Sequence, residues 1–537
     1  MMRAGKMLIL GLAMLLLPAM AGAQAEDLAN GIDLLSPRGR SIDSMFDTWQ
    51  FEVASRELQA LRLEKPGTAE TLYLEGYELF LKGDYVAAVV KLRAVESRGI
   101  HSQTVRGLRE MAEAAQTVID KHTERRSQNF VIRFPPEDEV LADTALATLE
   151  SALAALKQDI GFVPAWPIVV DIYRDAEDLA AVSPLTIAEV ERTGTIALCK
   201  WGRLMATTPR ALRHGYPWLD TLGHELVHYA VSSLTQDRTP VWLQEGFAKF
   251  LEARWRSPAS AQIAPSMEHL LAKALKKNDL ISFDAMHPSM AKLPGAEAAA
   301  LAFAEVATAL SFMYEHGGPL LLRDTLRRIN EGADAQSAVA AAMGIAWKDF
   351  DGLWRSYMKT RKYRTFADFE PMAPKLRKHK GGKGPNEDDG SGLGERSTQM
   401  LRLGNMLLLA GRARAAAIEY EKGKANARSG DWLFPVKLGR TYLALGDGAR
   451  ALSSVARFVE IYPELPWPHL ISGKAHLLLN DPPAAVAALN HAVANNPFDP
   501  EVQCGLSDAY ARSNNRSAED DVRWERARRA CLALGRQ

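Results

Sequence analysis

The chain has 537 residues, of which 47% are hydrophobic and 24% are charged, and its 65 basic and 65 acidic side chains leave no net charge. This composition is ordinary for a globular protein of several domains, and the balanced charge argues against a protein held to nucleic acid or anionic membranes by bulk charge. Three cysteines are too few for a disulfide-rich scaffold: either Cys504 and Cys531 pair, or these two and Cys199 are buried thiols.

Residues 1–25 have the layout of a secretory signal peptide. Two basic residues precede the apolar run 7–17, and small-residue cleavage sites follow at Ala23 and Ala25. The run is short for a membrane span, so we expect cleavage and export to the bacterial periplasm or outside the cell, the alternative being an uncleaved anchor. No later stretch is apolar for long enough to cross a membrane, so no transmembrane segment is expected after cleavage.

Residues 26–125 show the spacing of paired helices. In "LYLEGYELFLKGDYVAAVV", Gly76, Gly83 and Ala88 occupy positions that recur as a set near the C-terminus. Small residues let two helices approach closely, and a glycine closes the first helix of each pair. We therefore predict an N-terminal all-α block.

Between residues 126 and 365 the pattern becomes that of an α+β domain. "NFVIRF" (129–134) and "PIVVDIYRD" (167–175) are β-branched runs typical of strands, with helical periodicity between them. The stretch 194–208 predicts one or two further strands, and the rest is helical. Strands followed by helices predict an α+β unit of normal domain size.

The charged, glycine-rich stretch 366–396 predicts a solvated linker, because it has no apolar periodicity. Beyond it, residues 397–537 contain Gly404, Gly439, Gly473 and Ser507, at steps of 35, 34 and 34 residues. This period resembles that of the tetratricopeptide repeat, a pair of helices. The resemblance implies a solenoid in this block and, in the same frame, in 26–125, whose concave surfaces would bind a protein partner.

The motif HELVH predicts a metal site. On a helix, His224 and His228 lie one turn apart on the same face, where both imidazoles can reach one ion. Glu225 points to the side, where it can take a proton from the attacking water. Two histidines do not complete a zinc site. "TQDRTP" predicts a chain reversal with Thr239 as the N-cap of a second helix, and that helix brings Glu245 back as the third ligand.

HELVH followed by "WLQEGFAKF" resembles the gluzincin metallopeptidases, and the layout of residues 126–365 is similar to bacterial peptidase MA-like proteins that carry tetratricopeptide repeats. The resemblance implies that zinc (Zn²⁺) is bound by His224, His228 and Glu245, that Glu225 is the general base, and that the substrate is a protein or peptide. The fold class expected for the chain is an α+β zincin-like metallopeptidase domain between all-α tetratricopeptide-repeat blocks.

Two positions depart from the gluzincin pattern. Phe303 stands about where related sequences tend to carry a tyrosine, and its ring offers no donor to a developing oxyanion. Lys249 follows Glu245 by one turn and cannot accept a hydrogen bond from a ligand histidine, so Asp220 is the candidate to orient one, unless it is only an acid at a helix start. The other candidate oxyanion donors, each expected to serve packing or surface roles instead, are Tyr314, His316, His214, Tyr216 and Tyr229.

Three functions remain open from the sequence. The first is an exported zinc metallopeptidase whose repeats recruit a protein partner or substrate. The second is a non-catalytic scaffold of the cell envelope with a vestigial or structural zincin domain. The third is a metal-binding protein without catalysis, for which one three-ligand site is a small capacity. The intact Glu225 favours the enzyme.

Overall fold

The computed structural model describes residues 33–212, 215–257, 263–286, 290, 293–367, 393–427, 431–514 and 516–535. The predicted signal peptide (1–25), most of the predicted linker (366–396) and His214 lie outside these residues.

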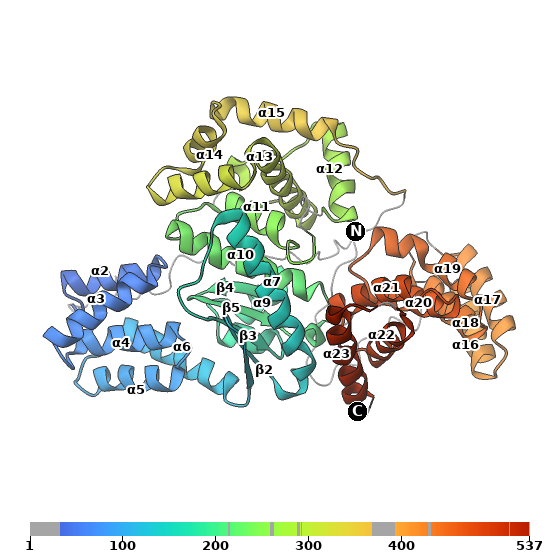
Figure 1. The fold of residues 1–537 in the computed structure, drawn as a ribbon, viewed down its shortest axis with the longest axis horizontal. Helices are drawn as coiled ribbons and strands as arrows, with labels where there is room; N and C mark the ends of the chain where they lie inside the picture. The colour runs from blue at the N-terminus through green and yellow to red at the C-terminus, as the bar shows by residue number, and fades with distance from the viewer. Residues whose placement is uncertain are drawn as a thin grey trace.

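The N-terminal block consists of helices that pack on their neighbours in sequence (Figure 1). They are α2 (Pro37–Asp47), α3 (Phe51–Glu64), α4 (Ala69–Leu81), α5 (Tyr85–Glu96) and α6 (Gln103–Ile119). Thr68, Asp84 and Ser102 cap α4, α5 and α6 by accepting a backbone N–H with their side chains. A Cβ on Gly76 would stand 2.9 Å from Leu92, so the predicted close approach of α4 and α5 requires glycine there. The predicted helix pairs are confirmed, whereas their assignment to tetratricopeptide repeats stays a prediction.

The middle domain, from β1 to α15, contains a five-stranded sheet of order β1-β2-β3-β5-β4. The strands are β1 (Thr123–Arg126), β2 (Phe130–Phe134), β3 (Ile168–Tyr173), β4 (Ala197–Lys200) and β5 (Arg203–Thr207). The central β2–β3 and β3–β5 pairs are parallel and the two outer pairs antiparallel. The sequence predicted β2 and β3, and one or two further strands over 194–208, where the structure has β4 and β5. β1 was missed, and it begins before the predicted boundary at residue 126.

Helices surround this sheet and build the rest of the middle domain. They are α7 (Ala142–Ile160), α8 (Ala176–Ala181), α9 (Ile187–Thr193), α10 (Trp218–Thr235), α11 (Val241–Leu251), α12 (Pro265–Lys277), α13 (Ala296–Asn330), α14 (Ala335–Met343) and α15 (Trp347–Thr360). α10 packs between β4 and β5 on one side and α11 and α13 on the other. Among the described helices, α13 has the length and composition of a membrane span, but 72% of its most apolar window is buried, as in a core helix.

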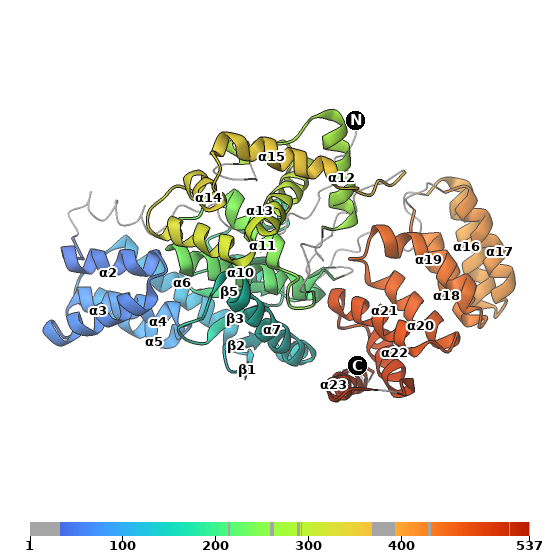
Figure 2. The ribbon, with the colours of Figure 1, turned by 45° about the horizontal axis from the view of Figure 1, so that its top comes forward.

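The C-terminal block is a second series of helices that pack each on the next (Figure 2). They are α16 (Glu395–Leu409), α17 (Ala413–Ala425), α18 (Leu433–Ala444), α19 (Gly448–Ile461), α20 (Pro466–Leu478), α21 (Pro482–Asn495), α22 (Pro500–Arg512) and α23 (Ala518–Leu534). A Cβ on Gly404 or Gly473 would stand 2.4 Å from the facing side chain, so these small residues do lie at helix contacts. A disulfide between Cys504 and Cys531 joins α22 to α23, and Cys199 is free.

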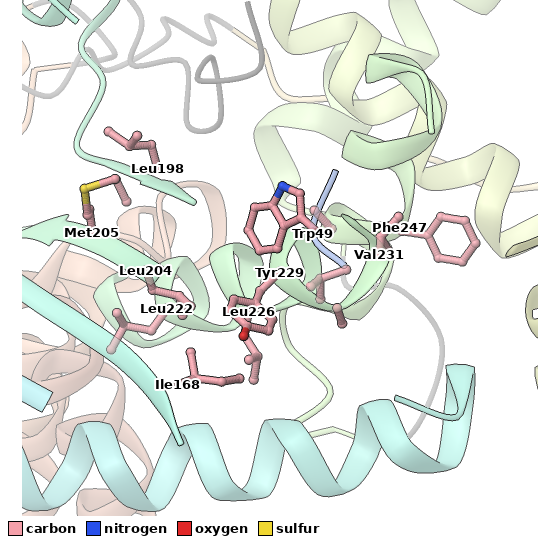
Figure 3. Packing of buried hydrophobic residues seen from close by; sticks show 14 of the residues in the cluster. Trp49, Ile168, Leu198, Leu204, Met205, Leu222, Leu226, Tyr229, Val231 and Phe247 are labelled. Carbon is pink, nitrogen blue, oxygen red and sulfur yellow. The ribbon is translucent and has the colours of Figure 1, made fainter. Parts of the chain in front are cut away.

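Both helical blocks contact α10. From the N-terminal block, the ring of Trp49 packs edge-on against Tyr229, with 5.2 Å between ring centroids (Figure 3). From the C-terminal block, the carbonyl of Asn495 accepts from the backbone N–H of Tyr216 at 2.9 Å, and the carbonyl of Val493 accepts from the indole of Trp218 at 3.2 Å. The N-terminal block and the middle domain share one hydrophobic core, whereas the C-terminal block has two smaller cores of its own.

Candidate metal centre

The helix α10 carries the HELVH motif deep in the protein. His224 is fully buried, and Glu225 and His228 are 1% and 7% exposed. Gly223, directly before the motif, is required by packing, because a Cβ there would stand 2.4 Å from the carbonyl oxygen of Glu252. This glycine therefore lets the end of α11 pass against α10.

The predicted chain reversal after α10 is a sharp turn. Gln236 and Asp237 both adopt left-handed backbone angles, with φ of 54° and 57°, and turn the chain toward α11. The prediction that Thr239 caps α11 is wrong: Pro240 is the N-cap residue, and the Thr239 hydroxyl donates to Thr235 instead, at 2.9 Å. The reversal nevertheless returns Glu245 to α10, as expected.

Three ligand atoms converge between α10 and α11. The Nε2 atoms of His224 and His228 are 3.1 Å apart, and Oε2 of Glu245 lies 3.3 Å from the first and 3.6 Å from the second. All three residues are buried, and their ligand atoms lie within 4.8 Å of one another. Although both nitrogens are near, Glu245 Oε2 has no partner at hydrogen-bond geometry among the described residues. Two imidazole nitrogens and one carboxylate oxygen are the donor set of a catalytic zinc site, so the residues fit Zn²⁺.

A carboxylate that the sequence did not indicate orients the first histidine. Oε2 of Glu252 lies 2.9 Å from Nδ1 of His224. Because an ionised carboxylate only accepts, the proton of the neutral imidazole lies on Nδ1, and Nε2 of that form has the lone pair for a metal. The ammonium of Lys249 donates to both oxygens of Glu252, at 3.0 and 3.2 Å. Glu252 lies two helical turns after Glu245, on the same face, and that spacing was the available signal.

Asp220 does not take the role expected of it. Its carboxylate accepts from the Trp255 indole at 2.9 Å and from Arg256, so it faces the chain beyond α11 rather than a histidine. The second histidine is oriented by Gln244, whose Oε1 lies 3.3 Å from Nδ1 of His228. Both ligand histidines therefore present Nε2 to the shared position.

The stretch of chain that contains this site matches a known protein family. Residues 148–360, from within α7 to the end of α15, match the model of the Peptidase MA superfamily. This stretch is a Peptidase MA superfamily domain. A comparison with curated proteins finds no match. The matched domain and its buried His224, His228 and Glu245 cluster together make this a zinc metallopeptidase site of the gluzincin type. The predicted bounds of this domain, 126–365, stay a prediction.

Burial and charge act against each other at the carboxyl groups of the Peptidase MA site. Burial raises the pKa of Glu225, and the two histidines lower it without cancelling the effect. Burial also raises the pKa of Glu245 and of Glu252. The two histidines lower the pKa of Glu245, and Lys249 and His224 lower that of Glu252, so both pKa values fall below the usual range. Burial lowers the pKa of His224, and its contacts with Glu245 and Glu252 raise it to about 9. The site therefore favours ionised ligand carboxylates.

Three of the residues considered as oxyanion donors, Tyr216, Tyr229 and Tyr314, make other contacts. The Tyr216 hydroxyl donates to the carbonyl of Thr207 at 2.5 Å. Tyr229 packs on aromatic rings, and Tyr314 packs against Phe250 with centroids 5.1 Å apart. Phe303 is buried with its ring centroid 5.9 Å from Nζ of Lys249, so a cation and an aromatic face, rather than a tyrosine hydroxyl, stand at this edge of the Peptidase MA site.

Proposed function

We propose that this chain is an exported zinc-dependent peptidase that cleaves protein or peptide substrates. The observation that carries the proposal is the convergence of His224, His228 and Glu245 on one buried position, with Glu225 beside it, inside a Peptidase MA domain. Three protein ligands leave one coordination position for water or substrate, as catalytic zinc sites do.

The proposed hydrolysis uses both the bound metal and side chains of the protein. Zn²⁺ held by the three ligands supplies a Lewis acid for the scissile carbonyl and the attacking water. Glu225 takes the proton of that water on its carboxylate and delivers it to the leaving amine. Its burial raises the pKa of the carboxyl, which makes it a stronger base than an exposed glutamate. Glu252 and Gln244 hold the ligand histidines with Nε2 toward the site.

The helical blocks supply surfaces for a protein substrate or partner. The repeat spacing of the sequence and the successive helix pairs support an assignment to tetratricopeptide repeats. The layout of residues 1–25 supports export to the bacterial periplasm or beyond. A protein that is recruited by these surfaces would be held on the same molecule as the zinc site.

A second candidate function is favoured by the depth of the site. Glu225 is 1% exposed, and Phe303 stands where a donor to the oxyanion was expected. A non-catalytic envelope scaffold with a structural zinc would have both features. It predicts capture of a protein partner at one-to-one ratio without cleavage.

The variant Glu225→Gln separates the two functions. Purified full chain and variant are loaded with Zn²⁺, their metal content is measured by mass spectrometry, and cleavage of an unstructured protein such as casein is followed. The proposal expects one zinc per chain in both and cleavage only by the wild type. Equal cleavage by both would refute the role of Glu225, and zinc without cleavage in either would favour the scaffold.

A further inference from the structure

The hydrogen bonds behind His228 continue past Gln244 to the end of α10. Nε2 of Gln244 donates to the Ser232 hydroxyl oxygen at 3.0 Å, and that hydroxyl donates to Oδ1 of Asp237 at 2.7 Å. With the 3.3 Å contact between Gln244 Oε1 and His228 Nδ1, these bonds form a continuous chain of four side chains. We call these four residues, Asp237, Ser232, Gln244 and His228, the relay.

The carboxylate of Asp237 determines which group donates and which accepts in each hydrogen bond of the relay. An amide and a hydroxyl can each donate or accept, so neither Gln244 nor Ser232 fixes its own orientation. The carboxylate of Asp237 accepts, so the Ser232 hydroxyl donates to it and its oxygen receives the amide N–H of Gln244. Gln244 must then turn Oε1 toward His228, which places the proton on Nδ1 and the lone pair on Nε2.

The opposite orientation of the Gln244 amide would prevent His228 from binding the metal through Nε2. With the amide turned round, Gln244 would present N–H to Nδ1 of His228, and the proton of a neutral imidazole would move to Nε2. Nε2 is the atom that faces His224 and Glu245. His224 does not need such a relay, because Glu252 accepts from it directly.

The backbone at the end of α10 is bent to hold Asp237 in place. Gln236 and Asp237 are consecutive non-glycine residues at positive φ, a conformation that asparagine and aspartate tolerate better than other side chains. The bend lets the Asp237 N–H donate to the carbonyl of Ser232 at 3.0 Å while its carboxylate accepts the Ser232 hydroxyl. The charge of Lys200, on β4, faces the same carboxylate.

We propose that Asp237 and Ser232 are positioning residues that set the tautomer of His228 and thereby the affinity of the site for zinc. The proposal rests on the zinc-peptidase function proposed above. Neither residue touches the position that the three ligands share. Removal of an outer partner of a ligand histidine typically weakens metal binding 10- to 100-fold, and we expect a loss of that size.

The test compares full-length Asp237→Asn and Ser232→Ala with the control Gln236→Asn. Asparagine keeps the shape and the left-handed backbone of Asp237 but can donate as well as accept, so the relay loses its direction. Gln236 has the same backbone conformation and no part in the relay. Zn²⁺ affinity is measured by competition with a chromogenic chelator, and the Co²⁺-loaded proteins are compared by their d–d absorption.

We expect about 10- to 100-fold weaker zinc binding and a shifted Co²⁺ spectrum for both relay variants, with the control like wild type. Wild-type affinity and spectrum in Asp237→Asn and Ser232→Ala would overturn the relay and leave the zinc site standing. An equal loss in Gln236→Asn would also overturn it, by assigning the effect to the backbone turn. If the wild type itself binds no zinc, the proposed function fails and the relay fails with it. Should Asp237→Asn not fold, Ser232→Ala decides alone.

Discussion

Replacement of Glu305 by glutamine should change how the stability of the chain depends on pH. Glu305 is fully buried in α13, where its Oε1 accepts from the backbone N–H of Ile281 at 3.0 Å. Its Oε2 is buried without a hydrogen-bond partner among the described residues. Burial raises the pKa of Glu305 to about 8, and the bond from Ile281 and the charge of Arg355 lower it only in part.

The sign and size of the effect follow from the pKa values of the two states. The ordinary pKa is 4.5 and the folded pKa about 8, so below pH 4.5 the group is protonated in both states and its contribution to stability is fully present. Between these values only the unfolded chain ionises, and stability falls by about 1.4 kcal/mol per pH unit. The total loss by pH 8 is about 4 to 5 kcal/mol. Above pH 8 the contribution no longer changes.

Replacement by glutamine removes this pH dependence but lowers the stability of the fold by an amount that does not change with pH. It keeps the acceptor for Ile281 but puts a buried amide N–H₂ where Oε2 stands, which costs about 1–3 kcal/mol without a partner. Glu305→Gln should therefore be less stable than wild type at pH 4.5 and more stable, by about 2 kcal/mol, at pH 8.

Scanning calorimetry of both proteins from pH 4.5 to 8.5 tests this expectation, with exposed Glu297→Gln on the same helix as control. The difference in Tm between Glu305→Gln and wild type should change sign across the series, whereas the control difference should stay small and nearly flat. Parallel Tm curves for wild type and Glu305→Gln would refute the assignment of a neutral, buried Glu305.

Two further predictions concern the sheet of the middle domain and the contact of the C-terminal block with α10. Arg203→Met should destabilise the chain by about 3 kcal/mol at pH 8, because it removes the buried cation 3.9 Å from the buried carboxylate of Asp171 and leaves that carboxylate only the charge of Arg133 among the cations that lower its pKa. The loss of stability should be smaller at pH 5, because burial raises the pKa of Asp171 to about 6 and its carboxyl is then mostly neutral. Denaturant titrations of wild type and variant at both pH values measure the loss. Equal losses at the two pH values would contradict this account. Gly215→Ala should break the contact of α21 with α10, since Gly215 has φ of 72° and a Cβ there would stand 2.0 Å from the carbonyl oxygen of Asn495. Faster hydrogen exchange at the Tyr216 amide, with a larger radius of gyration by X-ray scattering, would show the separation, and unchanged exchange would refute it.

The metal ligands were predictable because local geometry determines their placement. His224 and His228 are one helical turn apart whatever the rest of the fold does, and the return of Glu245 needs only a reversal and a second helix. The buried strands were predictable for the same reason, since β-branched runs indicate them directly. β1 has the sequence TERR and lies largely exposed at an edge of the sheet, so it carries no hydrophobic signal.

The residues around the ligands were not predictable in this way. Glu252 and Gln244 reach the histidines only because α10 and α11 pack at one particular distance, and Asp237 reaches Ser232 only because the chain turns sharply between these helices. Asp220, one turn before His224, looked better placed in the sequence, yet the chain beyond α11 supplies Trp255 and Arg256 to its carboxylate. Helical spacing says which residues share a face but not which neighbouring element that face meets.

The folding unit that supports the zinc site is larger than the matched residues 148–360. β3 is buried throughout and pairs in parallel with β2, which lies outside the match. Without β2, an apolar strand would become a sheet edge, which proteins avoid because such edges aggregate. From the N-terminal block, Trp49 packs on Tyr229, the residue after the ligand His228. The N-terminal helices therefore complete the core behind α10, and any surface they offer a substrate is rigidly joined to the helix that carries the metal ligands.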